Sequence, residues 1–152
     1  MAEEQKLSAT MAQATAKFTS GYNCAQSVLW AFRDEVGLEE DVALKLATGL
    51  GAGMGRKQEV CGAVTGGILV LGLRHGRGRA DDRAATELTY QKTRELMDRF
   101  AAKHGTCLCR QLLKGCDLAT EEGRRRIMAD GLHEKVCRAC VQIVVELLEQ
   151  MK

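Results

Sequence analysis

The sequence predicts an all-α fold: a single-domain bundle of about six to seven helices around a buried, glycine-rich central helix. Proline is absent, and aromatic residues make up only 4% of the 152 residues. The 16 glycines and many alanines favour close helix packing over the pleated faces of a sheet sandwich. No repeat, low-complexity tract or linker divides the chain. We therefore treat residues 1–152 as one domain, long enough to bury a core.

The first third of the chain is predicted to form three helices, over residues 6–19, 22–36 and 39–50. They are separated at Ser20-Gly21 and at Gly37, because glycine is favoured just after a helix ends. Glycine then occupies every second position from Gly49 to Gly55. This pattern indicates a loop or a very close backbone contact.

The central helix is predicted over residues 60–74. Residues 60–73 form the longest uncharged stretch, and its 14 residues are too short to span a bilayer. The consecutive apolar residues from Ile68 to Leu71 would also suit a buried strand. The length of the stretch and its helical neighbours favour a buried helix.

The second half of the chain is predicted to form a long helix over 80–103, a short helix over 106–113, a segment from residue 120, and a last helix over 132–151. Thr106 and Thr120 are placed as N-terminal caps. Gly131 is expected to interrupt the segment that begins at residue 120, before the last helix starts. That helix carries an apolar seam at four- and three-residue spacing, made of Cys137, Val141, Val144, Leu148 and Met151.

Charge and terminal sequence narrow the function class. The net charge of +2 lacks the basic excess of a nucleic-acid binder. The N-terminal residues show no basic start followed by an apolar run, so no secretory signal is predicted. We expect a cytoplasmic protein that binds neither nucleic acid nor membrane.

Seven cysteines are the unusual feature of this composition: Cys24, Cys61, Cys107, Cys109, Cys116, Cys137 and Cys140. The number is odd, and the expected compartment is reducing. A fixed disulfide framework is therefore disfavoured, and metal ligation or redox chemistry is the better interpretation. Any single one of these cysteines could equally pack in the core as a small apolar residue.

Three of the cysteines are predicted at helix starts, namely Cys24, Cys61 and Cys109. The partial positive charge of a helix N-terminus lowers a thiol's pKa and favours the thiolate, which is the form that binds metal or attacks a disulfide. Cys137 lies on the apolar seam and would face the same interior. After Cys61, the glycines Gly62, Gly66 and Gly67 would let a helix or an inorganic centre approach closely.

Two local pairs offer a further possibility. Cys107 and Cys109 form a C-x-C pair, and Cys137 and Cys140 form a C-x-x-C pair. Together they could supply a four-thiolate zinc site. The second pair lies within a predicted helix, however, whereas zinc-binding pairs usually sit on turns. This ranks zinc below an iron–sulfur or dithiol site.

Four segments occur in the order of a known family: GYNCAQSVL, CGAVTGGILVLGL, CRQLL and CRACV. The chain resembles the C-GCAxxG-C-C family from about Tyr22 to Leu148, and its central motif is Cys-Gly-Ala-x-x-Gly at Cys61–Gly66. The resemblance implies a small helical, redox-active protein suspected of binding an iron–sulfur centre. It also implies four signature cysteines: Cys24, Cys61, Cys109 and Cys137. The additional Cys107 and Cys140 lie near signature positions, which leaves the choice between Cys107 and Cys109 open.

The leading hypothesis is that the four signature cysteines converge and bind an iron–sulfur cluster, [2Fe–2S] rather than larger, for electron transfer or redox sensing. One alternative is a metal-free thiol–disulfide redox protein. Another is a structural or interaction module whose cysteines hold zinc or only pack. Whether the protein is an enzyme stays open. The expected partners are a redox protein and a second copy of the chain in a homodimer.

Overall fold

The computed structural model describes the backbone of residues 2–152 and the side chains of residues 9–152. Over this part the chain is helical, and it contains no β-strand. The sole extended pairing there is an isolated antiparallel bridge between Val60 and Leu108. The all-α prediction is therefore confirmed.

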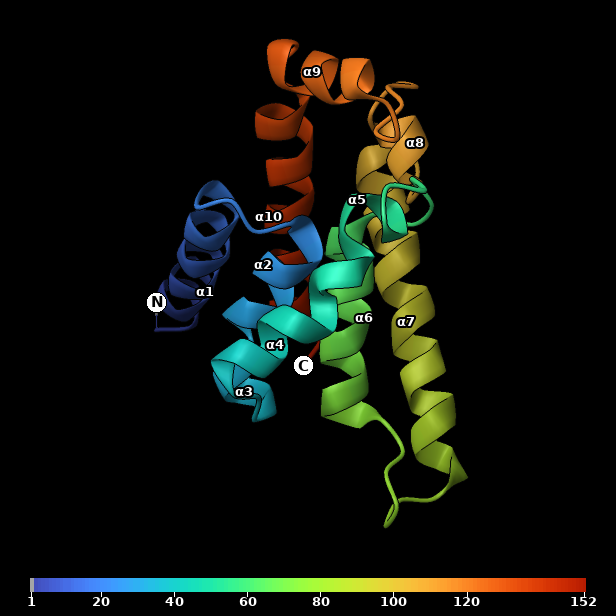
Figure 1. Cartoon of the computed structure of the whole chain (residues 1–152). Coiled ribbons are helices and arrows are strands. Elements are labelled where there is room, and N and C mark those ends of the chain that lie inside the picture. Colours follow the sequence, from blue (N-terminus) through green and yellow to red (C-terminus); the bar gives the residue numbers. More distant parts are fainter. Residues whose placement is uncertain (1) are drawn as a thin grey trace.

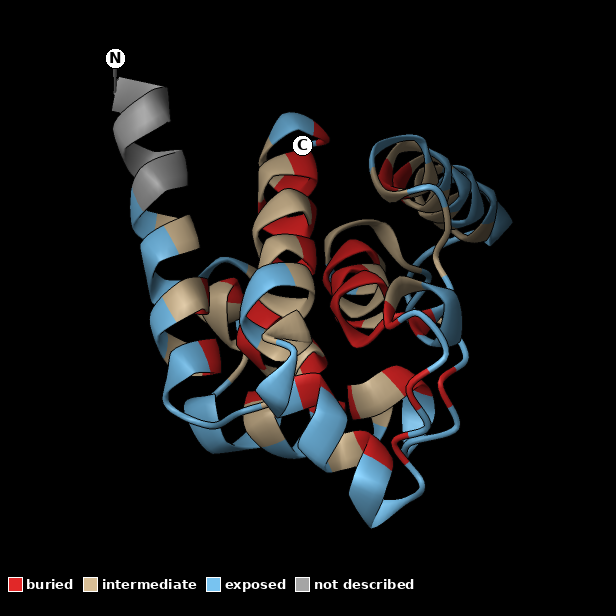
Figure 2. Ribbon diagram, turned by 90° about the horizontal axis from the view of Figure 1, so that it is seen from above, coloured by how far each residue is buried: buried red, intermediate tan, exposed pale blue. Residues whose placement is uncertain are grey.

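Helix α6 (Gly62–His75) is the centre of the bundle (Figure 1). It packs against α2 (Cys24–Ala31), α7 (Arg83–His104) and α10 (Arg138–Gln150), while α1 (Ala2–Thr19) covers α2 and α10. Figure 2 shows that the buried positions gather on the faces where these helices meet, with exposed positions around the rim. None of the described helices combines the length and hydropathy that crossing a membrane requires.

Glycines on α6 allow its neighbours to come close. A Cβ atom added at Gly66 would lie 2.8 Å from the carbonyl oxygen of Ala25 on α2. On another face, a Cβ atom added at Gly67 would lie 2.9 Å from a methyl group of Val144 on α10 and 3.0 Å from one of Leu96 on α7. The central helix is thus buried and glycine-rich because three helices approach its backbone.

Two predicted helices of the first third end earlier than expected. The predicted helix over 22–36 divides at Phe32 into α2 and α3 (Arg33–Val36), because Phe32 leaves the helical conformation at φ −99°, ψ 5°. Its ring is buried. The predicted helix over 39–50 is α4 (Glu40–Ala47) followed by a 3₁₀ turn, η1 (Thr48–Leu50). Gly37 ends α3 in the left-handed conformation, as predicted.

The C-terminal elements also differ in detail from the prediction. Helix α8 spans Cys109–Leu112 without a side-chain cap, and Thr106 instead accepts a hydrogen bond from the Leu108 N–H. Thr120 caps α9 (Glu121–Ala129), as predicted. The continuous helix predicted from residue 132 is wrong, because a π-helical turn, η2 (His133–Cys137), precedes α10.

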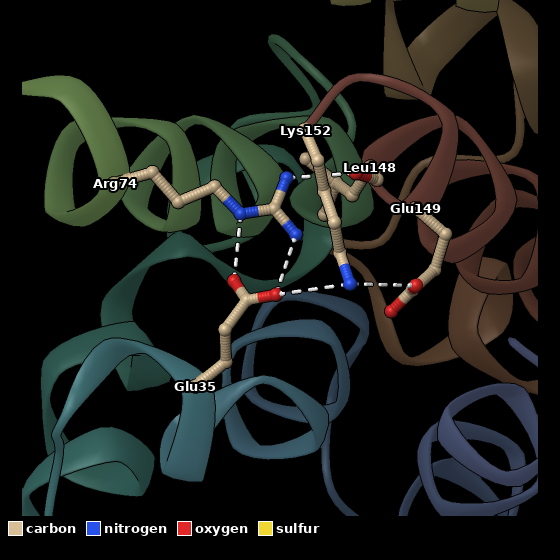
Figure 3. Close-up of polar contacts among 5 residues, drawn as sticks. All are labelled: Glu35, Arg74, Leu148, Glu149 and Lys152. Atoms are coloured by element: carbon tan, nitrogen blue, oxygen red, sulfur yellow. Dashed lines mark hydrogen bonds and ion pairs between the residues drawn. The ribbon is translucent and has the colours of Figure 1, made fainter. Parts of the chain in front are cut away.

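A partly buried arginine links three elements at the C-terminal end of α6 (Figure 3). The Arg74 guanidinium donates two hydrogen bonds to the Glu35 carboxylate on α3, at 2.7 and 3.1 Å. It donates a third to the Leu148 carbonyl of α10, at 2.7 Å. Lys152 also lies 3.7 Å from Glu35 and 3.2 Å from Glu149. This network fixes the end of the bundle opposite the cysteines.

Candidate functional site

Cys61 caps the N-terminus of α6. Its φ and ψ of −50° and 133° are extended, so the side chain stands at the open end of the helix. The Cys140 thiol donates a hydrogen bond to the Cys61 sulfur, and so do the backbone N–H groups of Ala63 and Val64. In that order, these bonds lower the pKa of Cys61 despite its burial. These donors therefore stabilise the thiolate form of Cys61.

Cys24 begins α2 beside the start of α6. Asn23 and Gln26 form a capping box that fixes this helix start, and the Asn23 side chain also donates to the Thr48 carbonyl. Because Gly62 has no side chain, the two helix starts lie close: a Cβ atom added there would be 3.4 Å from the Cβ of Cys24. The Cys24 thiol hydrogen-bonds to Cys137.

Cys137 and Cys140 face this point from the third side. Cys137 ends the π-helical turn and Cys140 lies three residues later, on the same face of α10. Cys137 is thereby paired with Cys24, and the buried Cys140 with Cys61. π-helical turns are often found at functional sites, and this one ends at Cys137, where the thiols meet.

Cys109 completes the group from α8. Its N–H donates to the Glu59 carbonyl at 2.7 Å, and the Cys61 N–H donates to the Cys107 carbonyl at 2.8 Å. These two hydrogen bonds join the segment before α6 to the segment before α8. The Cys109 thiol is buried, and it interacts electrostatically with Cys61 and Cys137. The structure thus brings the four signature cysteines together, with Cys140 as a fifth member.

The remaining two cysteines, Cys107 and Cys116, have other main partners. The Cys107 thiol donates to the Met97 carbonyl of α7 at 3.3 Å, and it interacts electrostatically with Cys61 but with no other thiol of the group. Cys116 is buried in a small second core that it shares with Cys109, Leu113, Leu118 and Ile127. Between the C-x-C cysteines, Cys109 is the better candidate ligand, since its thiol interacts with both Cys61 and Cys137.

We refer to Cys24, Cys61, Cys109, Cys137 and Cys140 as the thiol cluster. Sequence analysis ranked Cys140 only as a supporting residue. The signal that could have placed it is the C-x-x-C spacing on a helix, because residues three apart share a face.

The prediction that helix starts lower the pKa of three thiols is wrong for two of them. The pKa of Cys24 is raised well above its ordinary value by its hydrogen bond to Cys137, by burial and by the neighbouring thiolates. Burial and the charges of Cys61 and Cys137 raise the pKa of Cys109 to about 12. The Cys140 pKa is raised too, first by its bond to Cys61. One negative charge in a buried cluster opposes the next, and this outweighs the helix dipole.

A left-handed turn lies beside Cys109. Residues 52–56 all have positive φ, including the non-glycine residues Ala52 (54°), Met54 (69°) and Arg56 (69°), and Gln58 follows at 58°. The α5 segment (Gly51–Met54) is therefore not a right-handed helix. Each non-glycine residue in this conformation costs about 1–2 kcal/mol. The alternating glycines had indicated a loop or a close contact, and both are present.

Contacts on two sides hold this turn. A Cβ atom added at Gly53 would lie 2.8 Å from the Cβ of Cys109, so only glycine lets the turn approach α8. The buried Gln58 side chain donates to the Cys116 carbonyl at 2.7 Å and accepts from the Leu118 N–H at 3.0 Å. Gln58 also hydrogen-bonds to Cys109. The strained turn thus packs directly against Cys109, on one side of the thiol cluster.

The described side chains contain no group of three or more histidine, cysteine, aspartate or glutamate residues arranged for a metal ion. The thiols are instead paired by hydrogen bonds. Their chemistry nevertheless suits iron and sulfide, since cysteine sulfurs are the usual cluster ligands and four of them meet the usual count.

One comparison with known proteins gives a match. A family model described as "Putative redox-active protein (C_GCAxxG_C_C)" matches residues 22–151. No curated protein and no solved structure matches the chain.

Proposed function

Because the chain belongs to the C-GCAxxG-C-C family of redox-active proteins, we propose that the thiol cluster is its redox centre and that the four signature cysteines bind a [2Fe–2S] cluster. The observation that carries this proposal is the convergence on Cys61 of thiols from α2, α8 and α10. When bound, such a cluster supplies one-electron transfer, which suits an electron carrier or a redox sensor.

The residues around the cysteines would exclude water from the cluster and donate hydrogen bonds to its sulfur ligands. Burial of Cys61 and Cys109 keeps water from the sulfurs. The Ala63 and Val64 N–H groups stabilise negative charge on the Cys61 sulfur, and such bonds tune the potential of a sulfur-ligated centre. Cys140 donates to the same sulfur and could replace a neighbouring ligand.

Anaerobic purification followed by absorption spectroscopy and iron and sulfide analysis tests the proposal. We expect coloured protein with roughly two irons and two sulfides per chain. Cys61→Ser should remove the colour, whereas Cys116→Ser should keep it, because Cys116 is not one of the five thiols, although it packs in the same small core as Cys109. Protein that takes up no iron after reconstitution with ferrous iron and sulfide would refute the cluster. Zinc in its place would indicate the structural alternative.

A second candidate function is metal-free thiol–disulfide exchange, favoured by the two hydrogen-bonded thiol pairs, Cys24 with Cys137 and Cys61 with Cys140. In this reaction the Cys61 thiolate attacks a small-molecule disulfide and releases one thiol. Cys140 then displaces the second thiol, so the pair loses two electrons and two protons to the substrate. Alkylation before and after reduction, read by mass, tests it; equal alkylation of the pair in both samples, after exposure to the disulfide, excludes it.

The expected homodimer stays a prediction. Light scattering of the purified protein checks it, and a molar mass near that of one 16.6 kDa chain would contradict it.

A further inference from the structure

We propose that the cations around the left-handed turn form a docking surface for an acidic protein. This inference rests on the proposed function, since the docked protein is the partner that exchanges electrons with the thiol cluster. The surface is a pocket of about 380 Å³ whose lining includes Arg56 and Lys57 from the turn and Arg110 from α8. Figure 1 shows the turn (α5) and α8 side by side at one end of the molecule.

The three cations are exposed and free of ion pairs with any described residue. Some basic side chains, such as Lys45 and Arg99, pair with carboxylates on their own helices. Arg79 and Arg83, like the three cations, have no ion pair with a described residue. In the pocket a single carboxylate, that of Asp117, contributes to the lining. Three positive charges therefore face solvent with one negative charge among them.

Local stability does not explain why a cation occupies position 56. Arg56 has a φ of 69°, a conformation that glycine adopts without strain. Its guanidinium gains no ion pair within the described chain to offset that strain. Strained backbone that carries an outward-facing charge is more typical of binding surfaces than of structural positions.

The pocket lies directly outside the thiol cluster. Arg110 follows the buried Cys109 in the chain, and its guanidinium donates to the Lys57 carbonyl at 3.1 Å. Gln58, next to Lys57, hydrogen-bonds to Cys109. A partner bound to these cations would therefore sit over the thiol cluster with one layer of residues between.

Charge complementarity identifies the partner's chemistry. The net charge of the chain is only +2, so attraction to an acidic protein would be local to this surface. Electron-transfer complexes are commonly small and transient, and their charges speed and orient the encounter. Arginines can also bind a carboxylate with two parallel hydrogen bonds. We therefore expect aspartate or glutamate side chains of the partner to enter the pocket.

The test is an NMR titration of the isotope-labelled full chain, with an acidic plant-type ferredoxin and the basic protein cytochrome c as probes. With ferredoxin at low salt, we expect amide shifts to change at residues 52–59 and 109–117. Binding should weaken about tenfold at 0.15 M salt, where charges are screened beyond about 8 Å. Cytochrome c should leave these amides unchanged.

Charge reversal supplies the matched comparison. Arg56→Glu with Lys57→Glu should weaken ferredoxin binding at least about tenfold. Arg79→Glu with Arg83→Glu makes the same change of charge in the loop and helix start at the far end of α7, and should leave binding intact. A backbone spectrum of each variant checks folding, and Arg110→Glu alone provides an independent reversal.

Ferredoxin binding at another face, equal loss in both double variants, or no binding at all would overturn the docking surface. So would inorganic phosphate that occupies the pocket in the absence of any ferredoxin binding. The titration requires no electron transfer. Its failure is thus distinct from failure of the iron and sulfide analysis, which would refute the proposed function instead.

Discussion

Gly66→Ala tests whether the approach of α2 to α6 builds the thiol cluster. The added Cβ atom would lie 2.8 Å from the Ala25 carbonyl oxygen and 3.0 Å from the Ala25 Cα. Both are backbone atoms, which cannot move aside as a flexible side chain can. Restoring an ordinary contact requires the helices to separate by about 0.6 Å at this point.

The magnitude follows from comparison with Gly72→Ala in the same helix. A Cβ atom added at Gly72 would meet nothing within 4 Å. Both substitutions gain about 0.8–1 kcal/mol of helix propensity, so this gain cancels in their difference. Overpacking a core costs about 1–3 kcal/mol. Gly66→Ala should therefore be less stable than Gly72→Ala by about 1–3 kcal/mol.

Urea denaturation followed by circular dichroism measures this difference. Because α2 carries Cys24 and α6 follows Cys61, Gly66→Ala should also lower the iron content after reconstitution, whereas Gly72→Ala should not. Equal stability and equal iron content in the two variants would refute the argument that close helix packing at Gly66 assembles the site.

Three further predictions concern other parts of the fold. Arg74→Ala should lower the free energy of unfolding by about 1.5–3 kcal/mol in urea denaturation, because it breaks charged hydrogen bonds to Glu35 and α10; unchanged stability would contradict this. Burial lowers the pKa of His75, assisted by Lys92 and Arg74 and opposed by Glu35. The unfolded state therefore takes up the proton first as pH falls below about 6.5. Stability should decrease there, and His75→Gln should flatten the curve in pH-dependent unfolding. Asn23→Ala should lower the free energy of unfolding in urea by about 1 kcal/mol, because α2 loses its N-terminal cap. Unchanged stability would mean that the cap is dispensable.

The sequence was sufficient to predict the fold class and most helix positions, because those depend on apolar spacing and on glycine at helix ends. Gly37 ends α3 in the left-handed conformation as predicted, and Gly105 ends α7 in the same way. The left-handed turn could not be predicted, since Ala52, Met54 and Arg56 prefer other conformations. Only tertiary contacts, such as that between Gly53 and Cys109, hold them there.

The sequence could indicate which thiols were candidates to lie together, but not their electrostatics. Helix starts are local features and can be read from the chain; Cys61 lies at the start of α6, and its pKa is lowered. The raised pKa values of Cys24 and Cys109 depend on distant segments meeting in a buried space. Pairwise helix spacing would have indicated Cys140, but its partner Cys61 lies 79 positions away in the sequence.

The two candidate functions have one electrostatic origin. A cluster of closely placed thiols resists several negative charges at once, so the pKa of Cys61 is lowered while that of its partner Cys140 is raised. Hydrogen-bonded pairs are the arrangement expected of such thiols when no cation balances them. Iron would supply that positive charge and allow the remaining sulfurs to lose their protons. Iron analysis and thiol alkylation on the same preparation decide between the two functions.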